Sequence, residues 1–209
     1  MAHTLTAGSA TADRPRPEKN YLNQTTGIWS WLTTVDHKRI GIMYLIFGIT
    51  MLLMGGAMIL GVRAELFKPG LQLMQPEFFN QLISLHGLIM VFGFAMPVAT
   101  GLANYMLPMV IGAPDMALPR LNNWGFWILP PAAVMLVLPF FLGLMDIGPG
   151  AVDTGWTMYA PLSLQSGWGM DFAIFAVHML GVSSILGSIN VMLDASVDTR
   201  STSSPLGSR

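Results

Sequence analysis

Residues 38–65 read KRIGIMYLIFGITMLLMGGAMILGVRAE, and this stretch decides the fold. It holds no charged side chain over residues 40–62, whereas Arg39 precedes the apolar run and Arg63 follows it. A hydrocarbon core ~30 Å thick takes about 20 apolar residues in a helix, so the run is long enough to cross a membrane. The stretch therefore predicts a transmembrane helix.

Three more uncharged runs of this length follow, and they predict three more spans. One lies within residues 78–113, which is longer than a single span needs, and the others cover 121–145 and 172–193. Prolines interrupt these runs, at positions Pro97, Pro130, Pro131 and Pro139. Membrane helices tolerate such residues when neighbouring helices satisfy the freed backbone groups, so we expect kinks rather than breaks. The expected fold is an all-α, polytopic transmembrane bundle of four helices.

Composition agrees with a bilayer as the solvent and excludes other classes. Of 209 residues, 53% are hydrophobic and only 10% are charged, and the mean hydropathy is +0.56. A net charge of −1 without a basic, aromatic-interleaved cluster argues against a nucleic-acid binder. The chain has no cysteine, which excludes disulfides, thiolate metal sites and covalently attached c-type haem. Any metal must therefore have nitrogen or oxygen ligands.

The two ends of the chain are polar, and the basic residues predict its orientation. We expect a disordered cytoplasmic arm over residues 1–30, the helix bundle over 31–193, and a polar tail over 194–209. An inside N-terminus leaves only Arg63 and Lys68 of the 10 basic residues outside. The excess of cytoplasmic lysine and arginine that is usual in membrane proteins then places both termini in the cytoplasm.

His86 lies inside the second apolar run, in the stretch LHGLIMVFGF. Neutral imidazole is a good ligand for iron or copper, and a histidine in a dry helix bundle is suited to be an axial haem ligand. The alternative is a histidine that forms a hydrogen bond between helices. His178 has a similar setting in the fourth run but no accompanying signal, and we interpret it as a helix-packing residue.

Two charged residues follow the first span. Arg63 can pair with Glu65, extend to the membrane interface, or donate to a buried acceptor such as a cofactor substituent. Glu65 precedes the sequence LFKPG, so a carboxylate and turn carbonyls such as that of Gly70 lie close along the chain. These are the ligand types of a hard cation such as calcium or sodium.

Asp115 lies at one mouth of the predicted bundle, with Asn104 before it and Asn122 and Asn123 after it. A carboxylate beside amides that organise water can collect protons and pass them inward. The alternative is an ordinary loop aspartate that pairs with Arg120 or caps a turn.

The fourth run carries a polar stripe of three residues, Ser183, Ser184 and Asn190. Ser183 and Asn190 are seven residues apart and share a helix face. Such a stripe either joins helices through hydrogen bonds or lines a path for water.

Several of these stretches together resemble a known family. In order they are VDHKRIGIMYLIFG, RAELFKPG, LHGLIMVFGF, GAPDMALPRLNNWGFWILPP, GWTMYAPLS and GVSSILGSIN. They closely resemble the N-terminal third of subunit I of bacterial haem-copper cytochrome c oxidases, and the likeness runs from about Trp31 to about Met192. The family fold has twelve spans, so the four predicted here match its first third.

The resemblance implies roles for the residues above. His86 matches the first of two axial ligands of a low-spin haem, and Arg63 matches an arginine that donates to a haem substituent. Glu65 and the carbonyl of Gly70 match a peripheral cation site. The implied proton pathway begins at Asp115 and continues along Asn104, Asn122, Ser183, Ser184 and Asn190. His178 matches a family histidine that does not bind metal.

The resemblance also implies an activity and partners. The family reduces dioxygen to water with electrons from cytochrome c, coupled to proton translocation, in the bacterial inner membrane among other oxidase subunits. The second ligand of the low-spin haem and the ligands of copper and the high-spin haem lie on later helices of the family. We therefore expect a truncated chain whose tail 194–209 departs from the family, inactive alone and dependent on a complementary fragment of subunit I. The alternatives are an inactive remnant and a free-standing membrane haem-binding module that uses His86 and His178.

Overall fold

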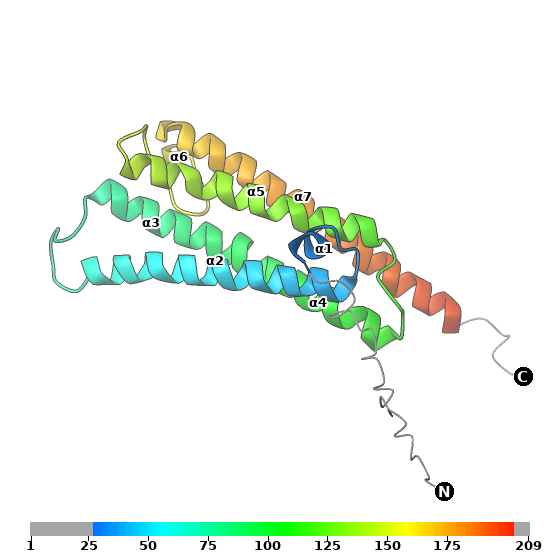
Figure 1. The fold of residues 1–209 in the computed structure, drawn as a ribbon. Helices are drawn as coiled ribbons and strands as arrows, with labels where there is room; N and C mark the ends of the chain where they lie inside the picture. The colour runs from blue at the N-terminus through cyan, green and yellow to red at the C-terminus, as the bar shows by residue number, and fades with distance from the viewer. Residues whose placement is uncertain (1–26, 203–209) are drawn as a thin grey trace, which may run out of the picture. The chain divides into compact units, whose positions relative to one another are not determined.

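The computed structural model describes residues 27–202, with side chains as far as residue 196, and every regular element in this part of the chain is a helix (Figure 1). The elements are α1 (Ile28–Leu32), α2 (His37–Glu65), α3 (Pro76–Leu88), the π-helix η1 (Ile89–Ala95), α4 (Met96–Ile111), α5 (Pro119–Leu144), α6 (Leu162–Gln165) and α7 (Trp168–Thr202). Helix α1 belongs to a unit that ends at Leu32, and the remaining helices belong to a second unit that starts at Thr33.

Four helical segments of the second unit are long and apolar enough to cross a membrane, which confirms the predicted all-α bundle. They are His37–Glu65, Pro76–Ile111, Pro119–Leu144 and Trp168–Ser196. The second of them consists of α3, η1 and α4 in succession. Helix α2 packs along α3, η1 and α4, and α5 packs along α7 (Figure 1).

The predicted ends of the bundle differ from the observed helices. Helix α7 continues to Thr202, although we expected the bundle to end at residue 193 and the polar tail to begin at residue 194. Residues 28–30, which we assigned to the arm, are part of α1. The rest of the predicted arm, residues 1–26, and of the predicted tail, residues 203–209, lies outside the described part of the chain.

The buried face of α2 explains how this helix packs. Its buried positions include 37, 41, 44, 48, 51, 55, 58, 62 and 65, which alternate in steps of four and three residues. This spacing keeps one narrow face turned toward neighbouring helices, as in coiled coils. A Cβ added to Gly41 would lie 2.9 Å from the carbonyl oxygen of Gly101, and a Cβ added to Gly101 would lie 2.7 Å from the Cβ of Tyr44. The glycines therefore permit the close approach of α2 and α4.

The second span changes its helical pitch at η1, which the sequence pattern did not predict. The amide of Met96 bonds to the carbonyl of Val91, five residues earlier, and Pro97 follows directly. Because Pro97 has no amide hydrogen and its ring excludes the carbonyl four residues back, a wider turn before it avoids this clash. Helix α5 contains Pro130, Pro131 and Pro139 and still runs as one helix, in agreement with the expectation that the prolines cause no break.

The interior of the bundle has an apolar half and a polar half. The apolar half, near the end of α2 that carries Glu65, is built around Leu85, Leu88 and Phe140, with Ala173 of α7. The polar half, at the other end of the same helices, contains the buried side chains of Tyr44, Asn104, Asn122, Ser183 and Asn190. The outward surface is apolar, with exposed residues such as Leu53, Leu60 and Phe175. A bilayer is the solvent that such a surface requires.

Candidate functional sites

Asp115 lies at the mouth of the polar half, in the loop between α4 and α5. Gly112, in the left-handed conformation (φ 74°), ends α4 and turns the chain into this loop. The Oδ1 atom of Asp115 accepts the amide of Met116 at 2.8 Å. It also lies 3.0 Å from Nδ1 of His37, at the start of α2, and because a carboxylate only accepts, the ring nitrogen donates. Asp115 is thus held by a histidine from another helix.

The alternative interpretation of Asp115 as the partner of Arg120 is wrong. Arg120 is exposed, and its guanidinium forms no ion pair with any residue that the structure describes. Asn123 is also directed elsewhere, because its Nδ2 donates to the carbonyl of Thr34. Asp115 does bind backbone amides, as the turn-capping alternative expected, since its Oδ1 accepts that of Met116 at 2.8 Å and that of His37 at 3.4 Å.

Two side chains of α7 bind the same loop. Oδ1 of Asp194 accepts the amide of Ala117 at 2.7 Å, and Oδ1 of Asn190 accepts the amide of Leu118 at 2.8 Å. Asp194 is only 4% exposed and Asn190 is fully buried. The loop that carries Asp115 is therefore attached to α7 by two side chains from adjacent helical turns.

The polar half contains buried polar atoms that have no hydrogen-bond partner among the described residues. Both side-chain polar atoms of Asn104 and of Asn122 are in this state, as are Nδ2 of Asn190, Oδ2 of Asp194 and Nε2 of His37. A buried polar atom without a partner is costly, and native proteins satisfy nearly all such atoms with protein groups or ordered water. These atoms therefore require partners that the described residues do not supply.

The polar stripe of α7 continues this region into the bundle. Oγ of Ser183 donates to the carbonyl of Gly125 on α5 at 2.6 Å, so this serine joins two helices. Ser183 and Ser184 also line a cavity of about 10 Å³ together with Tyr44. A cavity of this size holds about one water molecule. The structure thus shows the helix contact, while the role of the stripe as a path for water stays a prediction.

His86 lies in α3, within the second span, and is half-buried. Its Nδ1 is 2.9 Å from the carbonyl oxygen of Gly55 on α2. Because a carbonyl only accepts, Nδ1 carries the hydrogen, and in the neutral ring Nε2 keeps its lone pair. A backbone carbonyl on one ring nitrogen is the usual arrangement that orients a metal-binding histidine. His178 differs, because it is exposed and its Nδ1 lies 2.8 Å from the carbonyl of Ile174 on its own helix.

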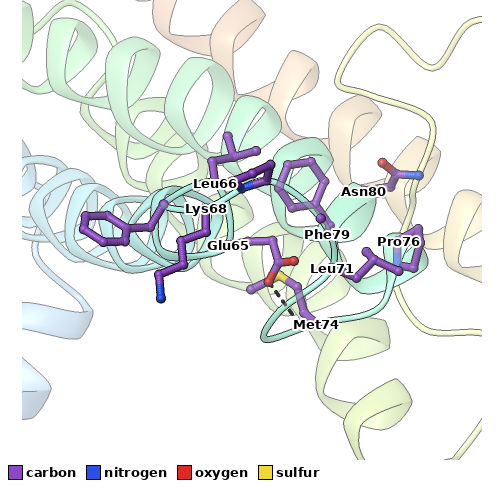
Figure 2. Close-up of a pocket in the computed structure, with 11 residues that line it drawn as sticks. Glu65, Leu66, Lys68, Leu71, Met74, Pro76, Phe79 and Asn80 are labelled. Carbon is purple, nitrogen blue, oxygen red and sulfur yellow. Dashed lines mark hydrogen bonds between the residues drawn. The ribbon is translucent and has the colours of Figure 1, made fainter.

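Glu65 ends α2 and binds the loop that follows it. Its Oε1 accepts the amide of Gln72 at 2.8 Å, and its Oε2 accepts the amides of Leu73 at 2.7 Å and Met74 at 3.1 Å. Glu65 lines a pocket of about 500 Å³. Figure 2 shows its carboxylate among the other lining residues, with a dashed line toward Met74 for their hydrogen bond. Both carboxylate oxygens therefore already have partners within the chain.

The other two predicted residues near Glu65 lie at the surface. Arg63 is exposed, and its guanidinium forms no ion pair or hydrogen bond with any described residue, so of its three alternatives the pairing with Glu65 is excluded. Gly70 is exposed in the loop and lines the same pocket as Glu65. The calcium or sodium site at Glu65 and Gly70 stays a prediction. Over the described residues, no three histidine, aspartate or glutamate side chains gather as a metal site.

Sequence reasoning missed three residues of the polar half. His37 and Tyr44 are seven residues apart on the buried face of α2, and the repeat of Gly41, Gly48 and Gly55 at the same period could have identified this face. Asp194 lay in the stretch that we assigned to the polar tail. No local signal distinguished it from a solvated carboxylate.

Comparison with known proteins identifies the family. The family described as Cytochrome C and Quinol oxidase polypeptide I matches residues 39–202. Cytochrome c oxidase subunit 1 of Corynebacterium efficiens is 43% identical over 188 residues, which cover 88% of this chain and 31% of that protein. The corresponding protein of Corynebacterium diphtheriae is 46% identical over 182 residues, covering 86% of this chain and 31% of its own length.

A less similar relative matches this chain over the same share of its own length. Cytochrome c oxidase subunit 1 of Synechocystis sp. is 41% identical over 190 residues, covering 90% of this chain and 31% of that protein. The chain thus spans about a third of the length of these relatives. Its four membrane-length helices, the likeness over most of its residues and the family match lead to one conclusion: the chain belongs to the family of cytochrome c and quinol oxidase polypeptide I.

Proposed function

We propose that the chain forms the part of subunit I of a respiratory oxidase that collects protons and holds one side of a low-spin haem. In this proposal the complete oxidase reduces dioxygen to water with electrons from cytochrome c and translocates protons. One observation carries the proposal: the buried, unpartnered amides of Asn104, Asn122 and Asn190 lie in the polar half whose mouth holds Asp115.

Asp115 is suited to take up protons from the aqueous side. Its side chain is 35% exposed, while the histidine bound to it is 5% exposed, so the carboxylate connects water with the interior. Water bound to Asn104 and Asn122 can then pass a proton along a chain of hydrogen bonds. Ser183, Ser184 and the cavity beside them extend this polar route along α7.

The setting of His86 fits an axial haem ligand. The bond from Nδ1 to the Gly55 carbonyl fixes the ring and leaves Nε2 free to bind iron. A low-spin haem with two axial ligands supplies one-electron transfer when bound. Arg63 has no partner among the described residues, and in our proposal it donates to a substituent of this haem.

The partners in this proposal are the helices that supply the remaining metal ligands. The second axial ligand, copper and the high-spin haem require residues of further helices of subunit I, in the inner membrane of a bacterium. The apolar outward surface serves both lipid and such helices. The excess of basic residues at the Asp115 end makes that end cytoplasmic, so that protons enter from the cytoplasm.

The haem role is tested first, on the chain purified from its native membrane in mild detergent together with whatever it binds. We expect haem bands in the reduced-minus-oxidised optical spectrum, and their loss in His86→Ala. His178→Ala is the matched control, since His178 is exposed and bound to its own helix, and we expect it to leave the bands unchanged. Equal loss of the bands in both variants would instead support the free-standing module, and bands retained in His86→Ala would refute the ligand role.

The proton role is tested by proton uptake of the same preparation during turnover with cytochrome c. We expect Asp115→Asn to slow uptake by about tenfold or more, because the carboxylate is the group that holds the proton. Asp171→Asn, at the exposed start of α7, is the control. Unchanged uptake in Asp115→Asn contradicts the proposal.

A further inference from the structure

Three successive amides of the loop between α4 and α5 are each bound by a different side chain. Met116 donates to Asp115, Ala117 to Asp194 and Leu118 to Asn190. Helix α5 begins at the next residue, Pro119, and its preceding residue provides no side-chain cap. The two side chains from α7 therefore fix the residues that lead into α5, from a distant part of the chain.

The burial of Asp194 makes this arrangement unusual. Its side chain is 4% exposed, its Oδ1 bonds to the loop, and its Oδ2 has no partner among the described residues. It interacts electrostatically with Asp115, which carries the same charge, and with His37. A second carboxylate close to Asp115 is unfavourable unless something compensates it. The amide of Ala117, which donates to Asp194, and His37 act in the opposite, favourable direction.

We propose that Asp194 is a positioning residue for Asp115. Asp194 and Asn190 form a clamp, here meaning their two side-chain acceptors bound to the amides of Ala117 and Leu118. The clamp fixes the residues directly after Asp115 against α7, so that the Asp115 carboxylate stays on His37 at the mouth of the polar half. The benefit of this placement for proton uptake rests on the function proposed above, whereas the clamp itself does not.

The clamp depends on the acceptor oxygen of Asp194 rather than on the volume of its side chain. Asp194→Asn keeps an oxygen acceptor of the same size for the amide of Ala117 but removes the charge. Asp194→Ala removes the acceptor and leaves the amide without its partner. If the Asp194 side chain only filled space, its removal would loosen α7 and the loop alike. It would then have no specific effect on Asp115.

The experiment uses the full chain purified from its native membrane and compares amide hydrogen exchange with the infrared bands of carboxyl groups. In the unaltered chain, we expect the amides of Ala117 and Leu118 to exchange about tenfold or more slowly than that of Asp115, which donates to no acceptor among the described residues. In Asp194→Ala, we expect the Ala117 amide to lose this protection and the Asp115 band, identified by its absence in Asp115→Asn, to shift. Asp194→Asn is expected to restore both.

The outcomes distinguish a clamp from a side chain that only fills space. Asp171→Ala, on the same helix but exposed, is the control and is expected to change neither signal. Fast exchange of Ala117 and Leu118 in the unaltered chain overturns the clamp without any variant, even where Asp194→Ala fails to fold. An unshifted Asp115 band in Asp194→Ala overturns the positioning role. A further outcome separates the two proposals: the Ala117 and Leu118 amides exchange slowly, but Asp115→Asn leaves proton uptake unchanged. This outcome supports the clamp and refutes the proposed function.

Discussion

The two ends of the bundle each use a carboxylate to hold a loop, yet they differ in what surrounds it. At one end, Glu65 binds three successive amides, and the interior beside it is apolar. At the other end, Asp115 and Asp194 bind successive amides, but the interior beside them contains amide groups without partners in the described chain. Polar groups with partners hold a structure together, whereas buried polar groups without partners require something further to bind.

The largest loss in the free energy of unfolding is expected when an amide is placed in the apolar half, which makes the two halves alike. Leu85 is fully buried there, and Leu85→Asn removes its packing and buries an amide without a partner. We expect a loss of about 2 to 5 kcal/mol in the free energy of unfolding, measured by steric trapping in a bilayer. Leu85→Met, which keeps the volume, is the control; equal losses in both variants would show that the amide is not the cause.

A smaller loss is expected where α2 and α4 are in closest contact, on the polar side of the bundle. A Cβ at position 101 would lie 2.7 Å from the Cβ of Tyr44, so Gly101→Val must separate the helices. We expect a cost of about 1 to 3 kcal/mol by the same measurement. Gly56→Val is the matched control, because an added Cβ at Gly56 meets no neighbouring atom within 4 Å. A larger cost at position 56 than at position 101 contradicts this account of the contact.

The opposite substitution, an apolar side chain placed in the polar half, is expected to change the free energy of unfolding little and proton uptake strongly. Asn122 is 1% exposed and neither of its polar atoms has a partner in the described chain. Replacing it by Leu removes buried polar groups and keeps a similar volume, so we expect a change of less than about 1 kcal/mol, of either sign. Under the proposed function, proton uptake by the preparation that contains the chain is expected to fall sharply. A large destabilisation with normal uptake would mean that Asn122 is structural.

The smallest effect, no change in amide exchange of the loop after α2, is expected from removing cations at the Glu65 end. Because three amides already bind the Glu65 carboxylate, we expect a chelator of calcium, in sodium-free buffer, to leave the exchange of the Gln72, Leu73 and Met74 amides unchanged. Glu65→Gln, which keeps one acceptor oxygen, is expected to speed their exchange. Faster exchange with the chelator alone would show that a cation holds this loop.

Much of the fold could be predicted from local sequence, but the pairing of polar groups could not. The runs that predicted four spans correspond to the four membrane-length helices, because span length and hydropathy depend only on nearby residues. The predicted end at residue 193 was too early, since a helix that is held by neighbours continues through polar residues such as Asp194. The π-helix η1 was also missed, because hydropathy does not register a change of helical pitch.

Sequence by itself determined that this protein is a membrane helix bundle, that His86 lies within a span, and that Asp115 lies in a loop at a mouth of that bundle. Only the tertiary structure decided which partners these residues have. Asp115 meets His37, 78 positions away, and Ala117 meets Asp194, 77 positions away. Helical periodicity assigns a residue to a face, but the neighbour of that face depends on how the helices pack. The physical reason is that burial leaves a polar group only the partners that packing brings within hydrogen-bond distance.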